Sequence, residues 1–422
     1  MHHFTYQNDI LHCEGVSVAA IADAIGTPVY IYSHATLTRN FHAFDSAFDG
    51  VERLVCYSAK ANTALGILKT LCDQGAGLDI VSGGELFKGL KAGFRPDTIV
   101  YSGVGKRIDE IDFALNSGIL MFNIESREEL DVLQERAKTL GKIARIAIRV
   151  NPDVDPKTHP HISTGLKKNK FGIDIEGAME TYAAASRMDH VAIIGVDCHI
   201  GSQITQVHPF EEALQSLIEL IDRLKAMHID IRYLDMGGGL GITYRDEHPP
   251  QPTEYAAAIR KVLGGRKLCM VFEPGRVLVG NAGILVTRVL YRKHAPSKEF
   301  VIVDAGMNDL LRPVLYGAFH DIRPVIRPVG SDEMVADVVG PICESGDFLA
   351  QMRSMPAVVR GDLLAVMSAG AYGFTMASNY CSRLRSAEVL VKGDRFAVIR
   401  ERETLADLIR KERMPDEYHC VL

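Results

Sequence analysis

Lys60 follows a short apolar run in the segment CYSAKANTALGILKT, residues 56–70, just before an apolar pattern of helical spacing begins. An ammonium at the end of a buried strand costs free energy to desolvate unless it is paired, solvated or used chemically. The other interpretation is a lysine whose carbon chain packs on apolar surface while its ammonium reaches solvent. This segment alone favours that second interpretation, so the rest of the chain must decide.

Four more polar residues accompany apolar runs later in the chain. Asp79 lies within one run, His199 ends another, and Glu273 with Arg276 follows a third. Taken singly, such a histidine is more often structural, and such a carboxylate often caps a helix. Their repeated position at or near the end of a run indicates one common site.

Three consecutive glycines, Gly237, Gly238 and Gly239, follow another run in the segment LDMGGGLGI, residues 234–242. Uncovered backbone amides let an anion such as phosphate approach closely. A tight turn also needs glycine. The segment by itself fits a turn and a phosphate site about equally well.

A lysine combined with a phosphate site points to pyridoxal phosphate. This cofactor needs a lysine amine for its aldehyde, donors for its phosphate, a flat face against its ring and a partner for its ring nitrogen. Lys60, the three glycines, His199 and Glu273 would meet these four needs in that order. The cofactor interpretation therefore outweighs that of a lysine reaching solvent.

Eight short apolar runs alternate with amphipathic stretches of helical spacing, and this rhythm must position the polar residues. The runs occupy residues 54–58, 77–81, 98–102, 119–123, 144–150, 191–199, 232–236 and 268–273. We predict a parallel (β/α)8 barrel, with a doubly wound sheet as the alternative fold. Polar residues that follow the strands of such a barrel line its catalytic face.

The sequence pattern changes after about residue 277, where valine-rich segments of alternating apolar and polar residues, separated by Gly and Pro, replace the long helical patterns. Such segments are typical of an antiparallel β domain. We predict a pyridoxal-phosphate-binding barrel over 36–277 and a β-sandwich or β-barrel-like domain built from 1–35 and 278–422. VYIYS, residues 29–33, is expected to add a strand to that β domain.

Composition bounds the class of protein. The 422 residues carry a formal net charge of -6 with 24% charged and 47% hydrophobic residues, which is typical of a soluble globular chain. Nucleic acid and acidic membranes are unexpected partners. Eight cysteines without C-x-x-C spacing argue against a disulfide framework or a metal cluster, and they favour a cytoplasmic location. We expect no export signal or membrane anchor.

Nine strings in one order resemble the diaminopimelate decarboxylases, fold-type III pyridoxal-phosphate enzymes related to alanine racemase and ornithine decarboxylase. The strings are YSAKAN (57–62), DIVSGGEL (79–86), RVNP with THPHISTGLKKNKFG (149–172), CHIGSQ (198–203), GGGLGI (237–242), EPGR (273–276), DAGMNDLLRPVLYGAFH (304–320), CESGD (343–347) and GAYG (370–373). MNDLLRP with YGAFH looks specific to the diaminopimelate enzymes. Ser58 and Phe319 depart from the commoner Ala and Tyr without touching a catalytic role.

The resemblance implies a role for each site residue. Lys60 would hold the cofactor, His199 would stack on its ring, and Glu273 would reach the ring nitrogen. Cys343 would donate the proton, and Lys60, Cys343 and His199 form the catalytic set. The cofactor-binding set is Lys60, Asp79, His199, Ser202, Gly237, Gly238, Gly239, Glu273, Gly275, Arg276 and Tyr372. The substrate-binding set is Arg276, Arg312, Tyr316, Glu344 and Tyr372. The resemblance implies no metal.

A substrate with a second amino-acid head needs a cation for its carboxylate and an anion for its ammonium, which Arg312 and Glu344 would supply. Each assignment has a structural alternative. Arg312 could form a surface ion pair, and Cys343 could be a small buried hydrophobe. Tyr316 and Tyr372 could pack in a core with satisfied hydroxyls.

The resemblance implies decarboxylation of meso-2,6-diaminopimelate to L-lysine and CO2, the final step of lysine biosynthesis. Because Cys343 would reach the active site of a second copy, it also implies a homodimer with shared sites. One alternative is a related decarboxylase of another basic amino acid or a carboxylated polyamine. The other is a non-catalytic homologue that binds the cofactor.

Overall fold

The computed structural model describes residues 2–155, 170–328, 330 and 332–415. The chain divides into two compact units. The first comprises Met1–His2, His34–Ala282 and Gly370–Thr375, and the second comprises His3–Ser33, Gly283–Ala369 and Met376–Leu422. None of the helices in the described ranges has the length and apolar character needed to cross a membrane.

The first unit contains a closed barrel of eight parallel strands. They are β5 (Arg53–Ser58), β6 (Gly77–Ile80), β7 (Ile99–Tyr101), β8 (Met121–Ile124), β9 (Ala144–Asn151), β11 (Val191–Asp197), β12 (Tyr233–Asp235) and β13 (Cys269–Phe272). Each strand pairs with the next, and β13 pairs with β5 to close the ring. The short β10 (Ile173–Asp174) pairs with β9. Each of the eight predicted runs overlaps one of these strands, with bounds that differ by a few residues, which confirms the (β/α)8 fold.

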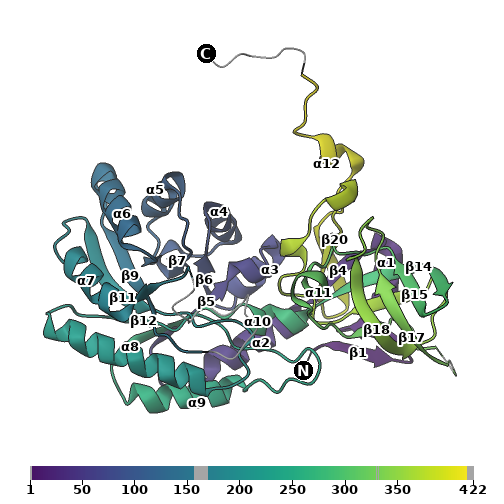
Figure 1. Cartoon of the computed structure of the whole chain (residues 1–422), viewed down its shortest axis with the longest axis horizontal. Coiled ribbons are helices and arrows are strands. Elements are labelled where there is room, and N and C mark those ends of the chain that lie inside the picture. The colour runs from purple at the N-terminus through teal and green to yellow at the C-terminus, as the bar shows by residue number, and fades with distance from the viewer. Residues whose placement is uncertain (1, 156–169, 329, 331, 416–422) are drawn as a thin grey trace. The chain divides into compact units, whose positions relative to one another are not determined.

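Helices surround the barrel strands (Figure 1). They are α2 (His34–Ser46), α3 (Leu65–Cys72), α4 (Gly83–Ala92), α5 (Ile108–Ser117), α6 (Arg127–Leu140), α7 (Ile175–Ala185), α8 (His208–Ala226), α9 (Pro252–Leu263) and the short α10 (Arg276–Val279). In α4, the Ser82 hydroxyl caps the first turn by accepting from Glu85 N at 3.2 Å. Gly93 ends this helix at φ 103°, a conformation that favours glycine. These caps fix where α4 begins and ends after β6.

Apolar side chains fill the barrel interior. Cys56, Val100, Met121, Ala147 and Val271 form one buried cluster there, contributed by five different strands. Strands buried on both faces read as continuous apolar runs, which is why the sequence revealed them. The carboxyl ends of these strands are left to carry polar residues.

The second unit is built mainly of β-sheet. A small sheet contains β1 (Phe4–Gln7), β2 (Ile10–Cys13) and β3 (Val16–Ser17). A nine-stranded sheet contains β4 (Val29–Ser33), β14 (Gly283–Ala295), β15 (Lys298–Val303), β16 (Ile322–Pro324), β17 (Glu333–Val339), β18 (Phe348–Pro356), β19 (Leu363–Val366), β20 (Ala387–Lys392) and β21 (Arg395–Arg400). Its helices are α1 (Val18–Ile25), α11 (Arg312–Tyr316) and α12 (Leu405–Ile409).

Most strand pairs of the second unit are antiparallel, as the sequence predicted. VYIYS forms β4, which confirms the expected early strand of this sheet. Two pairs, β15 with β17 and β4 with β20, are parallel. In both, a long stretch of chain separates the paired strands, and parallel neighbours require such a crossover.

Candidate active site

Lys60 lies in a short 3₁₀ turn, Ala59–Ala61, directly after β5. Its Nζ donates to Asp79 Oδ2 at 2.9 Å, and the Ser58 hydroxyl donates to the same oxygen at 2.6 Å. Asp79 is fully buried, whereas the Lys60 side chain is 35% exposed. Gly275 packs against this turn so closely that an added Cβ would lie 3.1 Å from Ser58 Cβ. The half-buried lysine therefore forms an ion pair with a buried carboxylate at a tightly packed strand end.

The pKa of Lys60 results from opposing effects. Burial lowers it, but the carboxylates of Asp79 and Glu273 outweigh burial and raise the pKa well above its ordinary value. Lys60 thus holds its proton while it is paired. A cavity of about 330 Å³, whose lining includes Lys60, Thr63 and Glu85, gives access to the amine.

His199 lies two residues beyond the end of β11. Its Nδ1 accepts a hydrogen bond from Gly238 N at 3.1 Å, which assigns the ring proton of the neutral form to Nε2. Burial, then the cations Arg149 and Lys60, lower the pKa of His199 well below its ordinary value. The imidazole is therefore neutral and offers an uncharged flat face.

The glycine turn after β12 is shaped by close backbone approach. Gly237 has φ 62° and Gly239 has φ 112°, conformations that favour glycine. A Cβ on Gly238 would lie 2.2 Å from the Glu273 carbonyl oxygen. Because the Gly238 amide already binds His199, the turn interpretation has direct support, and the phosphate contact stays a prediction.

Glu273 directly follows β13 and is buried among other carboxylates. Its Oε1 accepts from Ser102 Oγ at 3.0 Å and from Asn123 Nδ2 at 3.4 Å. Oxygen atoms of Asp197, Asp235 and Glu273 all lie within 4.8 Å of one another. Burial, followed by repulsion from neighbouring carboxylates including these two, raises the pKa of Glu273 well above its ordinary value. Such a carboxyl favours a bound proton or a cationic partner.

Arg276 contacts two further predicted residues of the first unit, Ser202 and Tyr372, and also Tyr244, which was not predicted. Its Nη2 donates to Ser202 Oγ at 3.0 Å and its Nη1 to Tyr244 Oη at 2.7 Å. The guanidinium also lies 5.0 Å from the Tyr372 ring centroid. Tyr372 has φ 56°, and its amide donates to Ala61 O at 2.8 Å. Tyr372 thereby contacts the turn that carries Lys60.

Arg312 and Tyr316 both belong to α11 of the second unit. Arg312 is buried, and its Nη1 donates to His320 Nε2 at 2.7 Å. His320 Nδ1 in turn bonds to Met367 O at 2.8 Å, which fixes Nε2 as the acceptor. A surface ion pair is therefore the wrong interpretation of Arg312. Tyr316 is half-buried.

Cys343 and Glu344 are exposed on the loop between β17 and β18. The exposure of Cys343 argues against the alternative of a small buried hydrophobe. Glu344 accepts a hydrogen bond from Tyr380 Oη at 2.9 Å. These two residues and α11 belong to the second unit, whereas the predicted residues around Lys60 belong to the first.

Residues 34–280 match the family model described as pyridoxal-dependent decarboxylase, pyridoxal binding domain. The curated diaminopimelate decarboxylase of Pseudomonas aeruginosa is 53% identical, over 97% of this chain and 99% of the relative. The chain belongs to the diaminopimelate decarboxylase family. A structure of the Helicobacter pylori enzyme complexed with L-lysine has a TM-score of 0.90 and 43% identity, over 93% of this chain and 98% of that one. A crystal structure of diaminopimelate decarboxylase from M. jannaschi has a TM-score of 0.94 and 38% identity, with 98% of both chains covered.

The first unit of this decarboxylase fits pyridoxal phosphate, the cofactor of its family. The Lys60 amine donates to buried Asp79, and the neutral His199 imidazole presents a flat face. The Glu273 carboxyl, crowded by other carboxylates, favours a cationic partner. Asp79 Oδ1 is buried without a hydrogen-bond partner in the described part of the chain. The amine suits the cofactor's aldehyde, the imidazole suits its aromatic ring, and the crowded carboxyl suits its ring nitrogen.

Sequence reasoning missed several residues of this polar cluster. Asp197 and Asp235 end β11 and β12, Asn123 lies in β8, and Arg149 lies in β9 next to Glu125, with Nη1 2.6 Å from Oε1. All five occur at or next to the carboxyl end of a barrel strand. Their position near a strand end is the signal that could have drawn attention to them, but the sequence does not show that these strand ends crowd together.

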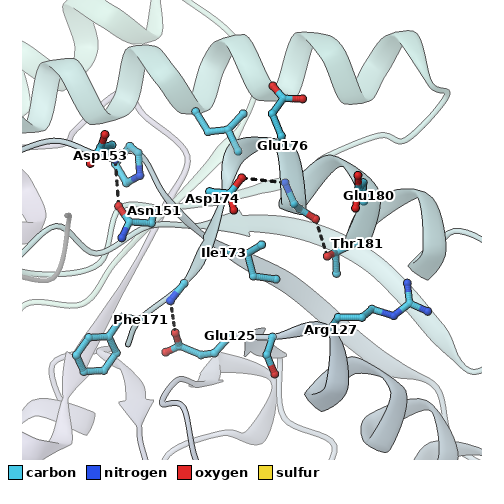
Figure 2. A pocket seen from close by; sticks show the side chains of 15 residues that line it. Glu125, Arg127, Asn151, Asp153, Phe171, Ile173, Asp174, Glu176, Glu180 and Thr181 are labelled. Carbon is cyan, nitrogen blue, oxygen red and sulfur yellow. Dashed lines mark hydrogen bonds between the residues drawn. The ribbon is translucent and has the colours of Figure 1, made fainter. Parts of the chain in front are cut away.

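A cavity of about 820 Å³ opens beside the same strand ends (Figure 2). Glu125 binds Gly172 N at 2.7 Å, and Asp174 caps α7 through Gly177 N at 3.1 Å. Much of the string THPHISTGLKKNKFG lies outside the described residues. The acidic lining consists of Glu125, Asp153, Asp174, Glu176 and Glu180, with Arg127 as a cation.

Proposed function

We propose that this chain decarboxylates meso-2,6-diaminopimelate to L-lysine and CO2, the final step of lysine biosynthesis. The observation that carries the proposal is the ion pair of Lys60 with buried Asp79, with Glu273 among the surrounding carboxylates. Arg312 and Glu344 add a cation and an anion for the second head of the substrate. The identity to diaminopimelate decarboxylases over nearly the whole chain supports the same substrate.

When bound, pyridoxal phosphate supplies an aldehyde for a lysine amine and a ring that accepts the electron pair of a breaking carbon–carboxylate bond. In this proposal Lys60 would hold the cofactor through its aldehyde, His199 would stack on the ring, and Glu273 would bind the ring nitrogen. Tyr372 would contact the cofactor, and Asp79 would fix the amine. The residues that would hold the phosphate are Ser202, Gly237, Gly238, Gly239, Gly275 and Arg276.

Lys60 must lose a proton before its amine can bond to a carbonyl carbon. Asp79 Oδ2, 2.9 Å from Nζ, is placed to hold that proton. Lys60 would hold the cofactor before the substrate binds, and the same free amine would release the product afterwards. The chain thereby uses one side chain for cofactor retention and product release.

Substrate recognition falls to Arg276, Arg312, Tyr316, Glu344 and Tyr372. An arginine offers a planar fork for the distal carboxylate, and a glutamate accepts from the distal ammonium. The carboxylate on the D-configured carbon leaves as CO2. Its departure leaves an electron pair that must be protonated on that carbon.

Cys343 supplies that proton from its thiol in this proposal. It does so in the active site of the partner subunit, so the working unit is a cytoplasmic homodimer with shared sites. The β domain, residues 1–35 and 278–422, contributes substrate and dimer contacts, while the barrel, 36–277, binds the cofactor. A single copy would then be inactive.

The test is CO2 release by the purified protein with added pyridoxal phosphate. Substrates are meso-diaminopimelate, L-lysine, L-ornithine, L-arginine and carboxynorspermidine. We expect release from diaminopimelate alone. Release from another substrate alone would retain the cofactor site and reject the assigned substrate. Cofactor absorbance without turnover of any of them would favour a non-catalytic homologue.

A further inference from the structure

Tyr380 touches the carboxylate that the proposed function assigns to the distal ammonium of the substrate. Its phenol donates to Glu344 Oε2 at 2.9 Å, and both side chains are exposed on the second unit. The bond uses one of the two carboxylate oxygens. A carboxylate held at one oxygen presents the other in a defined direction.

Hydrogen bonds that involve the backbone hold the loops of Glu344 and Tyr380 in place before the two side chains bond to each other. Buried Asp347 accepts from Met307 N at 2.6 Å and from Ile342 N at 2.7 Å, which anchors the loop of Glu344. The Tyr380 segment is anchored by Ser378 N, which donates to Asn308 O at 2.9 Å. Both loops are thus hydrogen-bonded to the adjacent residues Met307 and Asn308. The loops therefore lose little conformational freedom when the Tyr380–Glu344 hydrogen bond forms.

Asn379 strengthens the anchor under Tyr380. Its Nδ2 donates to Glu403 Oε2 at 2.6 Å and to Arg383 O at 2.9 Å. Arg383 N in turn donates to Tyr380 O at 3.3 Å, which closes the turn. The phenol is therefore presented by a clamped turn and not by a mobile chain end.

Gly346 leaves space at the second oxygen of Glu344. A Cβ there would lie 3.3 Å from Oε1, closer than most such contacts, and nothing about the Gly346 backbone requires glycine because its φ is not in the left-handed region. The absence of a side chain at Gly346 therefore leaves space beside Glu344 Oε1. An incoming ammonium needs that room to reach Oε1.

We propose that Tyr380 is a positioning residue for substrate selection, which fixes Glu344 through Oε2 so that Oε1 accepts from the distal ammonium. The inference rests on the proposed function, in which Glu344 receives that ammonium. The hydrogen bond to Glu344, then the charge of that carboxylate, raises the pKa of Tyr380, so the phenol remains a donor at neutral pH. Tyr380 acts through Glu344 and touches no reacting atom.

The test compares two competitive inhibitors that differ only in the distal ammonium. L-lysine carries it, whereas 6-aminohexanoate has the same carboxylate and terminal amine without it. Inhibition constants are measured against meso-diaminopimelate for the holoenzyme, Tyr380→Phe and a control, Tyr291→Phe, at another exposed tyrosine of the same unit. The ratio of the two constants is independent of the fraction of protein that folds.

We expect Tyr380→Phe to reduce the preference for L-lysine by roughly tenfold and to raise KM for diaminopimelate more than it lowers kcat. Gly346→Ala should reduce the same preference by crowding Oε1, while Tyr291→Phe leaves it unchanged. An unchanged ratio in Tyr380→Phe, or equal inhibition of the unaltered enzyme by both compounds, would overturn the inference. An unaltered enzyme that does not decarboxylate diaminopimelate would instead overturn the proposed function.

Discussion

The two units place their carboxylates in opposite surroundings. Around the barrel strand ends, Asp79, Asp235 and Glu273 are buried and close together, whereas Glu344 of the second unit is exposed and bound by Tyr380. A buried carboxylate tends to bind a proton or a fixed cation. An exposed carboxylate can bind a mobile cation at little desolvation cost. The barrel carboxylates therefore suit control of protonation at the cofactor, and Glu344 suits recognition of the substrate.

Lys60→Ala should give the largest effect, because it removes the amine that the barrel carboxylates hold. We expect activity to fall by at least about 10⁴-fold and the visible absorbance of bound cofactor to disappear. Absorbance spectroscopy and CO2 release measure the two losses. Lys69→Ala, at an exposed lysine of α3, is the control and should retain both. Persistence of the absorbance band in Lys60→Ala would remove Lys60 from its role.

Cys343→Ala tests the second unit at its proposed proton donor and should lower kcat by roughly 10²–10⁴-fold. Mixing this variant with Lys60→Ala under subunit exchange should restore about a quarter of normal activity, because half the dimers then contain one intact site of two. Activity after exchange is measured against each unmixed variant. No recovery despite demonstrated exchange would count against a site shared between two copies.

Arg312→Lys should raise KM for diaminopimelate roughly tenfold with a smaller change in kcat, since lysine cannot offer a planar fork to a carboxylate. Steady-state kinetics measures both constants. Arg323→Lys is the matched control, because Arg323 makes a surface pair with Asp321 in the same unit and such pairs contribute little. Equal effects of the two substitutions would argue against a carboxylate clamp at Arg312.

Asp235→Asn should have the smallest effect, on the pH dependence of stability. Burial, offset by the hydrogen bond from Gly237 N, raises the pKa of Asp235 from 3.8 to about 7. The folded chain then binds this proton more tightly than the unfolded chain does. The contribution of Asp235 to stability is therefore fully present below pH 3.8 and is lost as the pH rises through about 7.

Denaturant unfolding of the cofactor-free protein at several pH values measures this slope. Asp235→Asn should flatten it, because the amide cannot lose a proton over that range. Asp246→Asn, at an exposed carboxylate, should leave the slope unchanged. A slope that is the same in Asp235→Asn and in the unaltered protein would show that the buried cluster does not titrate there.

The barrel was predictable because its strands are buried on both faces and stand out as apolar runs. Lys60 and Glu273 were predictable because they follow such runs. Asp197 and Asn123 were missed, since their importance comes from crowding with strands far away in sequence. Sequence spacing along one strand does not report which other strands end beside it.

Some features of the second unit could not be predicted from the sequence, for a different reason. Alternating apolar residues predicted a mostly antiparallel domain but not which strands pair, so the parallel pairs β15–β17 and β4–β20 were not anticipated. The burial of Arg312 depends on His320, whose tautomer is set by Met367 O. That support is visible only once the backbone places the three residues together.

The most direct test of the central claim uses meso-diaminopimelate labelled with carbon-13 in the carboxylate on its D-configured carbon. Holoenzyme is incubated with this substrate, and the CO2 and the lysine are analysed by mass spectrometry and chiral chromatography. The account predicts labelled CO2 and unlabelled L-lysine in equal amounts. Unlabelled CO2, D-lysine, or no turnover by a protein that has bound the cofactor would contradict it.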